Sequence, residues 1–509
     1  MAEFAHPNSG ARRSVRCRAS MTTQSDRVAR QQHPKFGHGP KYVVLMSDDG
    51  FGMEGALIYQ SQSENIRMVL AGEVMPSRHL TPFTEPDYLA AIELIRAGDV
   101  AFTNLETVVR LRDEGTPAFT RGTPMTTAPV LLNDLKWMGF NLMSTANNHM
   151  GDFGPDGAAA TIEHLRRADL AFAGSGYNLG EARMPGYLDT KAGRVGLVAA
   201  TTIFKPGEQA AAQRPDTIGR PGVNPVRFST TYTVDDNAMA ALDRIARALG
   251  LAQDNARARQ SFFSATEFPE DTAQMLNFLG SEFHLGTIFG RTTKVNAHDA
   301  EANLRAIREA RRQADWVLFS LHNHEYGAQG RTTAPTRMEL EMPAEFVIEL
   351  SRAAIDAGAD AVVGHGMHVT AGIEIYKGKP IFYSLGNHVL QNDTIEVVPA
   401  EGYERFGLDM TATPADFLDA RNGNGTRSFA AYAEFWETVT ATCDYAGGKL
   451  TGVRLHPIDL GFRLPRPQQG RPVLAHGETA HRILVRVARL SRNHGTIIDI
   501  EGETAVIRL

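Results

Sequence analysis

The sequence predicts an α/β fold in which short buried strands alternate with amphipathic helices. From Asn65 onward, runs of β-branched and other apolar residues alternate with segments whose apolar residues recur at helical spacing, and this pattern is typical of stacked βα units. The composition agrees, because 42% of the 509 residues are hydrophobic and 22% are charged, as in ordinary globular proteins. At this length, one large domain with insertions or two domains are both reasonable.

The predicted elements follow one another regularly over most of the chain. Strands are expected at residues 66–72, 100–106, 140–146, 170–174, 194–201, 315–322 and 359–365, and helices at 87–98, 129–139, 156–169 and 344–358. Residues 373–387 predict a hairpin that turns at Lys377 and Gly378. Near the C-terminus we expect strands 437–445 and 449–460 and then a helix over 478–491.

The remaining segments differ in composition and set the expected domain boundaries. Residues 1–40 are polar and basic, which predicts a disordered tail, and Met21 is an alternative start. A main domain is expected over 41–490, with an insertion or cap at 206–300 that we expect to control substrate choice, and with a C-terminal strand segment at 491–509. We expect a short strand at residues 41–46 and a turn at 48–50. Residues 401–431, rich in Gly and Asn, predict a loop.

Charge, cysteine content and hydrophobicity exclude several classes of protein. The net charge is -6, so no basic face for nucleic acid is expected. The two cysteines, Cys17 and Cys443, exclude a disulfide framework and a Cys-rich zinc site. No apolar run has the length of a membrane span or of a secretory signal, so we expect a cytoplasmic protein without stable membrane insertion.

Side chains that suit a metal centre lie at the ends of five of the predicted strands, with Asp99 at the edge of strand 100–106. In a stacked α/β sheet, ligands bind beyond the carboxyl ends of the strands, so these side chains are expected at one rim. Carboxylates and an amide oxygen suit hard cations, whereas imidazoles suit zinc, manganese or iron. The mixture predicts one or two divalent cations, with Zn, Mn or Fe favoured and Ca or Mg left open. The residues are Glu73, Asp99, Asn104, Glu106, Asn148, His149, Asp152, His322, His365 and His368.

These same segments resemble the CapA family, the poly-γ-glutamate capsule biosynthesis and hydrolysis proteins of the calcineurin-like metallophosphoesterase superfamily. The resemblance extends over roughly residues 66–490 and implies a four-layer αββα sandwich. The matching segments are LAGEVMPSR (70–78), GDVAFTNLETVV (98–109), STANNHMGDFGPDG (144–157), SLHNHEYG (320–327), VVGHGMHVTAGIEIYKGKPIFYSLGNHVL (362–390) and HPIDLGF with GRPVLAHGETAHRIL (456–484).

The resemblance also implies roles for individual residues. Metal ligands would be Glu73, Asp99, Asn148, His322, His365 and His368. Either Asp99 or Glu106 would match the family's second acidic position, with Asn104 beside it. The family's first motif has Asp where this chain has Glu73, and the extra methylene moves the carboxylate outward by about 1.5 Å. His149 with Asp152 would handle protons. Substrate contacts are expected from Asn104, Glu106, Arg78, Arg121 and Asn387.

Several of these residues also have a purely structural interpretation. Asp152 could cap the helix that begins near Pro155, and Asn104 could be a turn residue that bonds its own backbone. His324 and Glu325 could be loop surface, and the family motif at this point is one residue longer than in this chain.

The function that the resemblance implies is hydrolysis of amide or peptide-like bonds, with γ-glutamyl polymers as the substrate class. Two enzymatic alternatives use the same site, namely peptide epimerisation by proton abstraction and phosphoester hydrolysis. A third alternative is a protein without turnover that binds capsule polymer or assists its assembly. The presence of Glu73 where the family has Asp favours this alternative.

Overall fold

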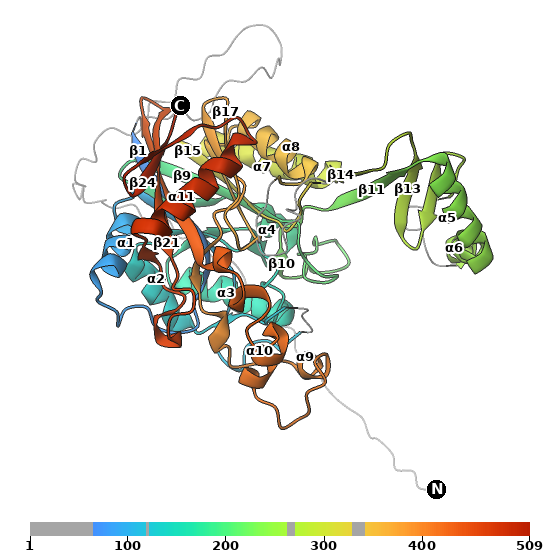
Figure 1. Ribbon diagram of the computed structural model, residues 1–509, viewed down its shortest axis with the longest axis horizontal. Helices are drawn as coiled ribbons and strands as arrows, with labels where there is room; N and C mark the ends of the chain where they lie inside the picture. Colours follow the sequence, from blue (N-terminus) through green and yellow to red (C-terminus); the bar gives the residue numbers. More distant parts are fainter. Residues whose placement is uncertain (1–64, 119–121, 262–269, 328–341) are drawn as a thin grey trace, which may run out of the picture. The chain divides into compact units, whose positions relative to one another are not determined.

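The computed structural model describes residues 65–118, 122–261, 270–327 and 342–509. The predicted tail at 1–40, the strand at 41–46, the turn at 48–50 and Arg121 lie outside the described residues. The described chain is mixed α/β (Figure 1), which confirms the predicted fold class. Within it, no helix combines the length and the apolar character needed to cross a bilayer.

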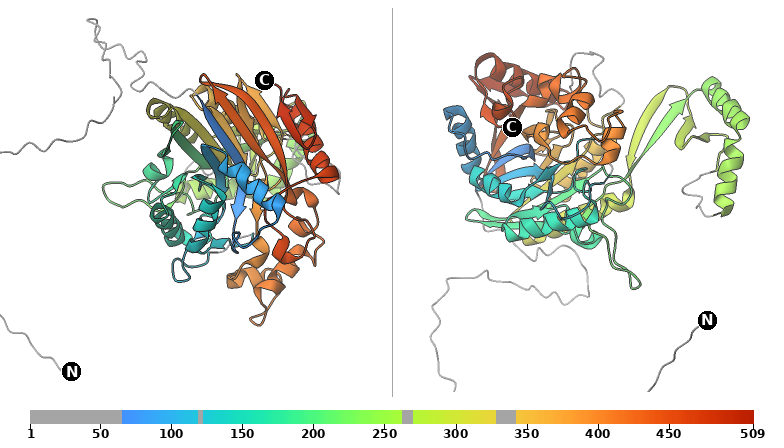
Figure 2. Two further views of the ribbon diagram at one scale, coloured as in Figure 1. Left: turned by 90° about the vertical axis from the view of Figure 1, so that its left-hand side faces the viewer. Right: turned by 90° about the horizontal axis from the view of Figure 1, so that it is seen from below.

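The larger sheet has ten strands. Five of them, β19, β1, β2, β5 and β6, run parallel to one another, and β20, β21, β24 and β23 continue the sheet with antiparallel pairing. Figure 2 shows the blue strand β1 beside the orange C-terminal strands. The bounds in sheet order are β23 (Ile498–Glu501), β24 (Thr504–Ile507), β21 (Lys449–Asp459), β20 (Glu437–Ala446), β1 (Ile66–Met75), β2 (Val100–Leu105), β5 (Leu142–Ser144) and β6 (Ala171–Ala173), with β19 (Asn387–Leu390) on β1 and β22 (Val473–Leu474) on β21.

The second sheet has six strands, of which the inner four are parallel. Its edges are the antiparallel strands β8 and β17. The hairpin between β17 and β18 turns at Lys377 and Gly378, whose φ angles are 51° and 75°, as a tight hairpin turn requires, so this prediction is confirmed. The bounds in sheet order are β17 (Ile373–Tyr376), β18 (Lys379–Phe382), β16 (Ala361–His365), β15 (Trp316–His322), β9 (Gly193–Thr201) and β8 (Gly186–Thr190).

The two sheets share one apolar core, and helices cover their other faces. Leu70 and Phe102 of the first sheet belong to the same buried cluster as Leu318 and Val363 of the second. Helices α1 (Pro86–Arg96) and α2 (Leu132–Met138) pack on the other face of the ten-stranded sheet. Helices α7 (Ala297–Gln313) and α8 (Glu345–Asp356) pack on the other face of the six-stranded sheet. Helix α11 (Gly477–Arg492) contacts both sheets, and α3 (Gly154–Arg167) contacts β3, β6 and β7.

The region predicted as an insertion contains a separate small sheet. Strands β12 (Met275–Phe278), β13 (Ser281–Leu285), β11 (Phe228–Val234) and β14 (Gly290–Val295) pair in that order, and α5 (Asp236–Leu249), which is followed by α6 (Leu251–Ser261), packs on β12 and β13. The ring of Phe228 stacks on Phe346 of α8, with centroids 4.7 Å apart. The short elements β7 (Ser175–Gly176), β10 (Gly222–Val223), α4 (Leu179–Arg183), β3 (Val108–Val109) and β4 (Thr126–Thr127) complete the regular structure up to this sheet.

The prediction of a loop over residues 401–431 was wrong. This stretch holds the end of α9 (Ala400–Glu404) and all of α10 (Pro414–Asn422). Thr413 and Asp416 form a capping box at the start of α10, and Gly423 ends the helix in the left-handed conformation. The Gly and Asn residues that suggested a loop therefore terminate a helix. Helix α7 was also missing from the predicted elements.

Gly72 provides a test of how tightly β1 packs against the loop before β19. A Cβ at this position would lie 1.8 Å from the carbonyl oxygen of Gly386, so the backbone must move to admit it. We expect Gly72→Ala to lower the free energy of unfolding by about 2 kcal/mol or more, measured by urea denaturation. Gly452→Ala in β21 is the control, because a Cβ there has no neighbour within 4 Å. Equal small losses in both variants would contradict this packing.

Candidate metal centre

The carboxyl ends of the parallel strands in both sheets bring the candidate residues together. In the ten-stranded sheet, Glu73 lies in register with Asn104 on β2 and with Asn387 on β19. In the six-stranded sheet, His322 of β15 lies beside His365 of β16. Glu73 Oε1 is 3.9 Å from Nδ1 of His322, so the two strand ends meet at one site.

Glu106, directly after β2, lies at the centre of this site. Its Oε1 atom is 3.8 Å from Nε2 of each of three histidines, His149, His322 and His368. The side chain is fully buried, and neither carboxylate oxygen has a hydrogen-bond partner among the described residues. A buried carboxylate without donors is costly, and a cation bound beside it would remove that cost.

Glu73 is the second fully buried carboxylate of the site. Its Oε1 accepts a short hydrogen bond from the backbone N–H of Gly366, and its Oε2 is 2.7 Å from Nδ1 of His368. Burial raises the pKa of Glu106, and the neighbouring charge of Glu73 raises it further. Burial alone would also raise the pKa of Glu73, but His368 and His365 outweigh it and lower that pKa.

The histidines of β15 and β16 are held in fixed orientations by their neighbours. Nδ1 of His322 is 2.9 Å from Nδ1 of His365, and its Nε2 is 2.7 Å from Oδ1 of Asn148. Nε2 of His365 is 2.6 Å from the hydroxyl oxygen of Ser320. Burial lowers the pKa of His365 to about 4, and burial together with nearby imidazoles lowers the pKa of His322 well below its usual value. Both rings are therefore neutral near pH 7, the form that binds metals.

Two groups of buried side chains, drawn from five residues, could hold an ion. The first group is Glu73, His322 and His365, and the second is Glu73, Glu106 and His368. Within each group the potential ligand atoms lie within 4.8 Å of one another. Glu73 belongs to both groups, so the site has room for one cation or for a pair that shares this carboxylate.

His368 lies in the loop after β16 and is supported by Asn387, the first residue of β19. His368 adopts a φ of 59°, which is unusual for a side chain other than glycine. Its Nδ1 is 2.9 Å from Oδ1 of Asn387, whose amide nitrogen donates to the backbone carbonyls of His368 and Phe435. Asn387 thus orients His368, whereas the sequence had predicted a substrate contact for it.

His149 and Asp152 form a buried pair beside the two groups. Nδ1 of His149 is 2.6 Å from Oδ2 of Asp152, and the same oxygen accepts from the backbone N–H of Met125 at 2.8 Å. The interpretation of Asp152 as a helix cap was wrong, because α3 has Phe153 at its N-cap and no side-chain capping bond. Since Asp152 fixes Nδ1, Nε2 of His149 is the atom turned toward Glu106.

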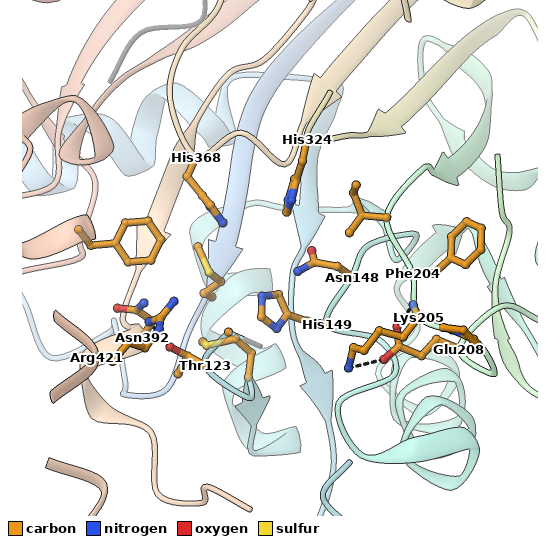
Figure 3. A pocket seen from close by; sticks show the side chains of 16 residues that line it. Thr123, Asn148, His149, Phe204, Lys205, Glu208, His324, His368, Asn392 and Arg421 are labelled. Carbon is orange, nitrogen blue, oxygen red and sulfur yellow. Dashed lines mark hydrogen bonds and ion pairs between the residues drawn. The ribbon is translucent and has the colours of Figure 1, made fainter. Parts of the chain in front are cut away.

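A cavity of about 680 Å³ opens onto the site (Figure 3). His149, His324, His368 and Asn148 point into it. Other lining residues come from loops and helices that no metal-type motif marks, namely Thr123, Met125, Phe204, Lys205, Glu208, Asn392, Arg421 and Phe429.

Two predicted residues lie away from the centre. Asp99 was predicted as a ligand, but it is exposed at the start of β2 and accepts from the backbone N–H of Arg67. Five residues of extended chain separate Asp99 from Asn104, roughly 17 Å. Arg78 was predicted to bind substrate, but its guanidinium donates to Thr394 and to the backbone carbonyls of Arg466 and Gln469. Arg78 therefore connects the segments that contain these three residues through hydrogen bonds. Arg121 lies outside the described residues.

Asn104 lies inside the cluster, with its amide nitrogen 3.4 Å from Nδ1 of His322, so its interpretation as a turn residue was wrong.

His324 was interpreted as loop surface, yet it lines the cavity and burial lowers its pKa to about 4. The sequence did contain a signal for this position of His324. It lies two residues after His322, and residues at that spacing share a face of an extended chain. Glu325 accepts from the Thr202 hydroxyl and the His324 N–H and supports this loop.

The unpaired state of Glu106 predicts an unusual effect on stability. In protein treated with EDTA, Glu106→Gln keeps the shape and removes a carboxyl group whose charged form is disfavoured by burial and by Glu73. We therefore expect the free energy of unfolding to rise by about 1 to 3 kcal/mol. Glu437→Gln is the matched control, because Glu437 is also buried but accepts from Arg482 and Arg486, and its loss should destabilise by about 3 kcal/mol. Urea denaturation measures both, and a comparable destabilisation in the two variants would contradict the unpaired state.

Comparisons with known proteins identify the family of the chain. The family model described as "Bacterial capsule synthesis protein PGA_cap" matches residues 67–392. The protein y4sH of Sinorhizobium fredii (strain NBRC 101917 / NGR234) is 35% identical over 456 residues, which are 88% of this chain and 94% of y4sH.

Two Bacillus proteins named for capsule or PGA biosynthesis are more distant. "Capsule biosynthesis protein CapA" of Bacillus anthracis is 22% identical over 66% of this chain and 62% of that protein. "PGA biosynthesis protein CapA" of Bacillus subtilis (strain 168) is 24% identical over 62% of this chain and 61% of that protein. These matches confirm the resemblance to CapA. Because the family model covers well over half of the chain, the protein belongs to the PGA_cap family of bacterial capsule synthesis proteins.

Proposed function

We propose that the protein is a metal-dependent hydrolase of amide or peptide-like bonds whose substrates are γ-glutamyl polymers. The observation that carries this proposal is Glu106, whose buried and unpaired carboxylate faces three imidazole nitrogens at 3.8 Å. The substrate class comes from the names of the relatives, which refer to capsule and PGA biosynthesis. The two sheets with a common core and helices on their outer faces support a four-layer sandwich of the metallophosphoesterase type.

The residues fit a divalent cation. Ligand atoms bound to one zinc-sized ion at about 2.0–2.2 Å from it lie about 3 to 4 Å apart, and the distances from Glu106 to Nε2 of His322 and of His368 fall in this range. The ligands would be Glu73, Glu106, His322, His365 and His368, with Asn148 at the side of the cavity. The donor set of carboxylates and imidazoles suits Zn, Mn or Fe. Such an ion would polarise a carbonyl oxygen and lower the pKa of a bound water.

His149 is the group best placed to move protons. Asp152 accepts a hydrogen bond from Nδ1 of His149, which leaves Nε2 as a proton acceptor directed toward the cavity. Nε2 would take a proton from the attacking water and return it to the departing amine, so that the leaving group departs neutral. Asp152 holds the ring in this tautomer, and Met125 holds Asp152.

Metal content tests the centre itself. Protein purified without chelator should contain bound divalent metal by elemental analysis, and Glu106→Gln should lower the affinity for that metal at least about tenfold because an anionic ligand is lost. Glu93→Gln on the exposed side of α1 makes the same chemical change and should leave metal content as it is. A protein that binds no divalent metal, with or without the substitution, would contradict the proposal.

A substrate comparison tests the reaction. The metal-loaded protein should hydrolyse a γ-linked glutamate oligomer faster than an α-linked peptide or an aryl phosphate. We expect His149→Ala to lower kcat about 100-fold or more, and His481→Ala, on the exposed face of α11, to serve as control. Turnover of the aryl phosphate alone would make the protein a phosphoesterase, and inverted configuration without cleavage an epimerase. Metal binding without any turnover would favour the polymer-binding role.

A further inference from the structure

We propose that Arg421 binds a free carboxylate of the substrate beside the metal centre. This inference rests on the proposed function, since it names the group that recognises the substrate at the same site. Arg421 lies in the last turn of α10, in a region that the family match to residues 67–392 does not reach.

The side chain of Arg421 is placed by contacts within the fold. Helix α10 is fixed by the capping box at Thr413 and by the buried residues Phe417 and Leu418. Nη1 of Arg421 donates to the Thr123 hydroxyl oxygen in a short hydrogen bond. Figure 3 shows Arg421 beside Thr123 and Asn392, on the cavity that His149 and His368 also line.

The positive charge of Arg421 has no acidic partner within ion-pair distance in the described part of the chain. Thr123, which is neutral, is its hydrogen-bond partner. Burial lowers the pKa of Arg421, and the nearby charge of Arg405 lowers it further. A half-buried guanidinium without an anion is unfavourable, and an anionic group in the cavity would remove that cost. The planar fork of donors on arginine matches a carboxylate in two-point geometry.

The other charged groups of the cavity favour a group with a single negative charge. Lys205, on the opposite side of Figure 3, is 2.6 Å from Glu208, so these two charges offset each other. Arg421 then supplies one net positive charge outside the candidate ligands. One positive charge balances the carboxylate of a peptide, whereas a phosphate monoester near pH 7 carries a larger charge.

A γ-linked glutamate tripeptide and its analogue with α-carboxamides in place of the α-carboxylates test this inference. With the metal-loaded full chain, Arg421→Ala should raise KM for the carboxylate peptide about 10- to 100-fold, because a charge-assisted hydrogen bond is lost. The value of kcat and the metal content should change little. The carboxamide analogue should be a poor substrate for the wild type, and Arg421→Ala should cause no further loss with it.

Two variants control for charge and for structure. Arg421→Lys keeps the charge but not the fork, so it should recover part of the affinity. Arg405→Ala removes an exposed charge next to α9 and should have a much smaller effect than Arg421→Ala. An equal loss with both peptides, or an equal effect of the two alanine variants, would contradict a direct contact between Arg421 and a carboxylate.

Binding measured by calorimetry separates this inference from the proposed reaction. If no peptide is cleaved, the hydrolase proposal fails, but the tripeptide should still bind the metal-loaded protein and lose about 10- to 100-fold in affinity on Arg421→Ala. If the peptide binds equally well to both proteins, or if Arg421→Ala affects only an aryl phosphate, the assignment of Arg421 to a carboxylate is overturned.

Discussion

Two glutamates with no exposure to solvent face a set of histidines where the parallel strands of both sheets end. Burying one carboxylate is unfavourable, and burying two within reach of each other is more so, unless positive charge lies between them. Glu73 offsets part of this cost through the N–H of Gly366 and its contact with His368. Glu106 has no such donor. The chain therefore keeps a locally unfavourable arrangement, and such arrangements of ionisable groups are common at functional sites.

The surrounding structure is organised to hold these two side chains in place. Gly72 lets β1 approach the loop before β19, and Gly366, with a φ of 111°, lets the loop after β16 approach the backbone of Asn323. His368 has a left-handed backbone, and Nδ1 of its ring lies 2.7 Å from Oε2 of Glu73 and 2.9 Å from Oδ1 of Asn387. Neither sheet carries all the candidate ligands, since the glutamates come from one and His322 and His365 from the other. The packing of the two sheets therefore creates the site.

The part of this site that follows strands could be predicted from the sequence. Glu73, Asn148, His322, His365 and His368 come directly after or within buried apolar runs, and the rule that ligands gather at the carboxyl ends of parallel strands places them at one rim. The same rule places Asp99 away from the site, because Asp99 precedes β2 and so lies at the opposite edge of the sheet. The sequence left the second acidic position open between Asp99 and Glu106, because sequence alone does not say which of several polar residues turns toward the other sheet.

Residues outside the strand pattern could not be found in this way. Arg421 lies on a short helix in a stretch whose Gly and Asn content suggested a loop, and only the tertiary fold brings it to the cavity. Arg78 is the converse case. Its place in a family motif suggested a substrate contact, but its guanidinium donates to backbone carbonyls. For long cationic side chains, the partner is decided by packing between distant segments, and no local pattern encodes it.

Anomalous X-ray diffraction from crystals of the protein, grown without chelator and with the metal identified at its absorption edge, would locate a cation held by Glu106. We expect an anomalous peak within about 2.3 Å of a Glu106 carboxylate oxygen and of an imidazole nitrogen of His368 or His322. A fully occupied metal elsewhere, or no peak while Glu106 remains buried and unpaired, would contradict this expectation.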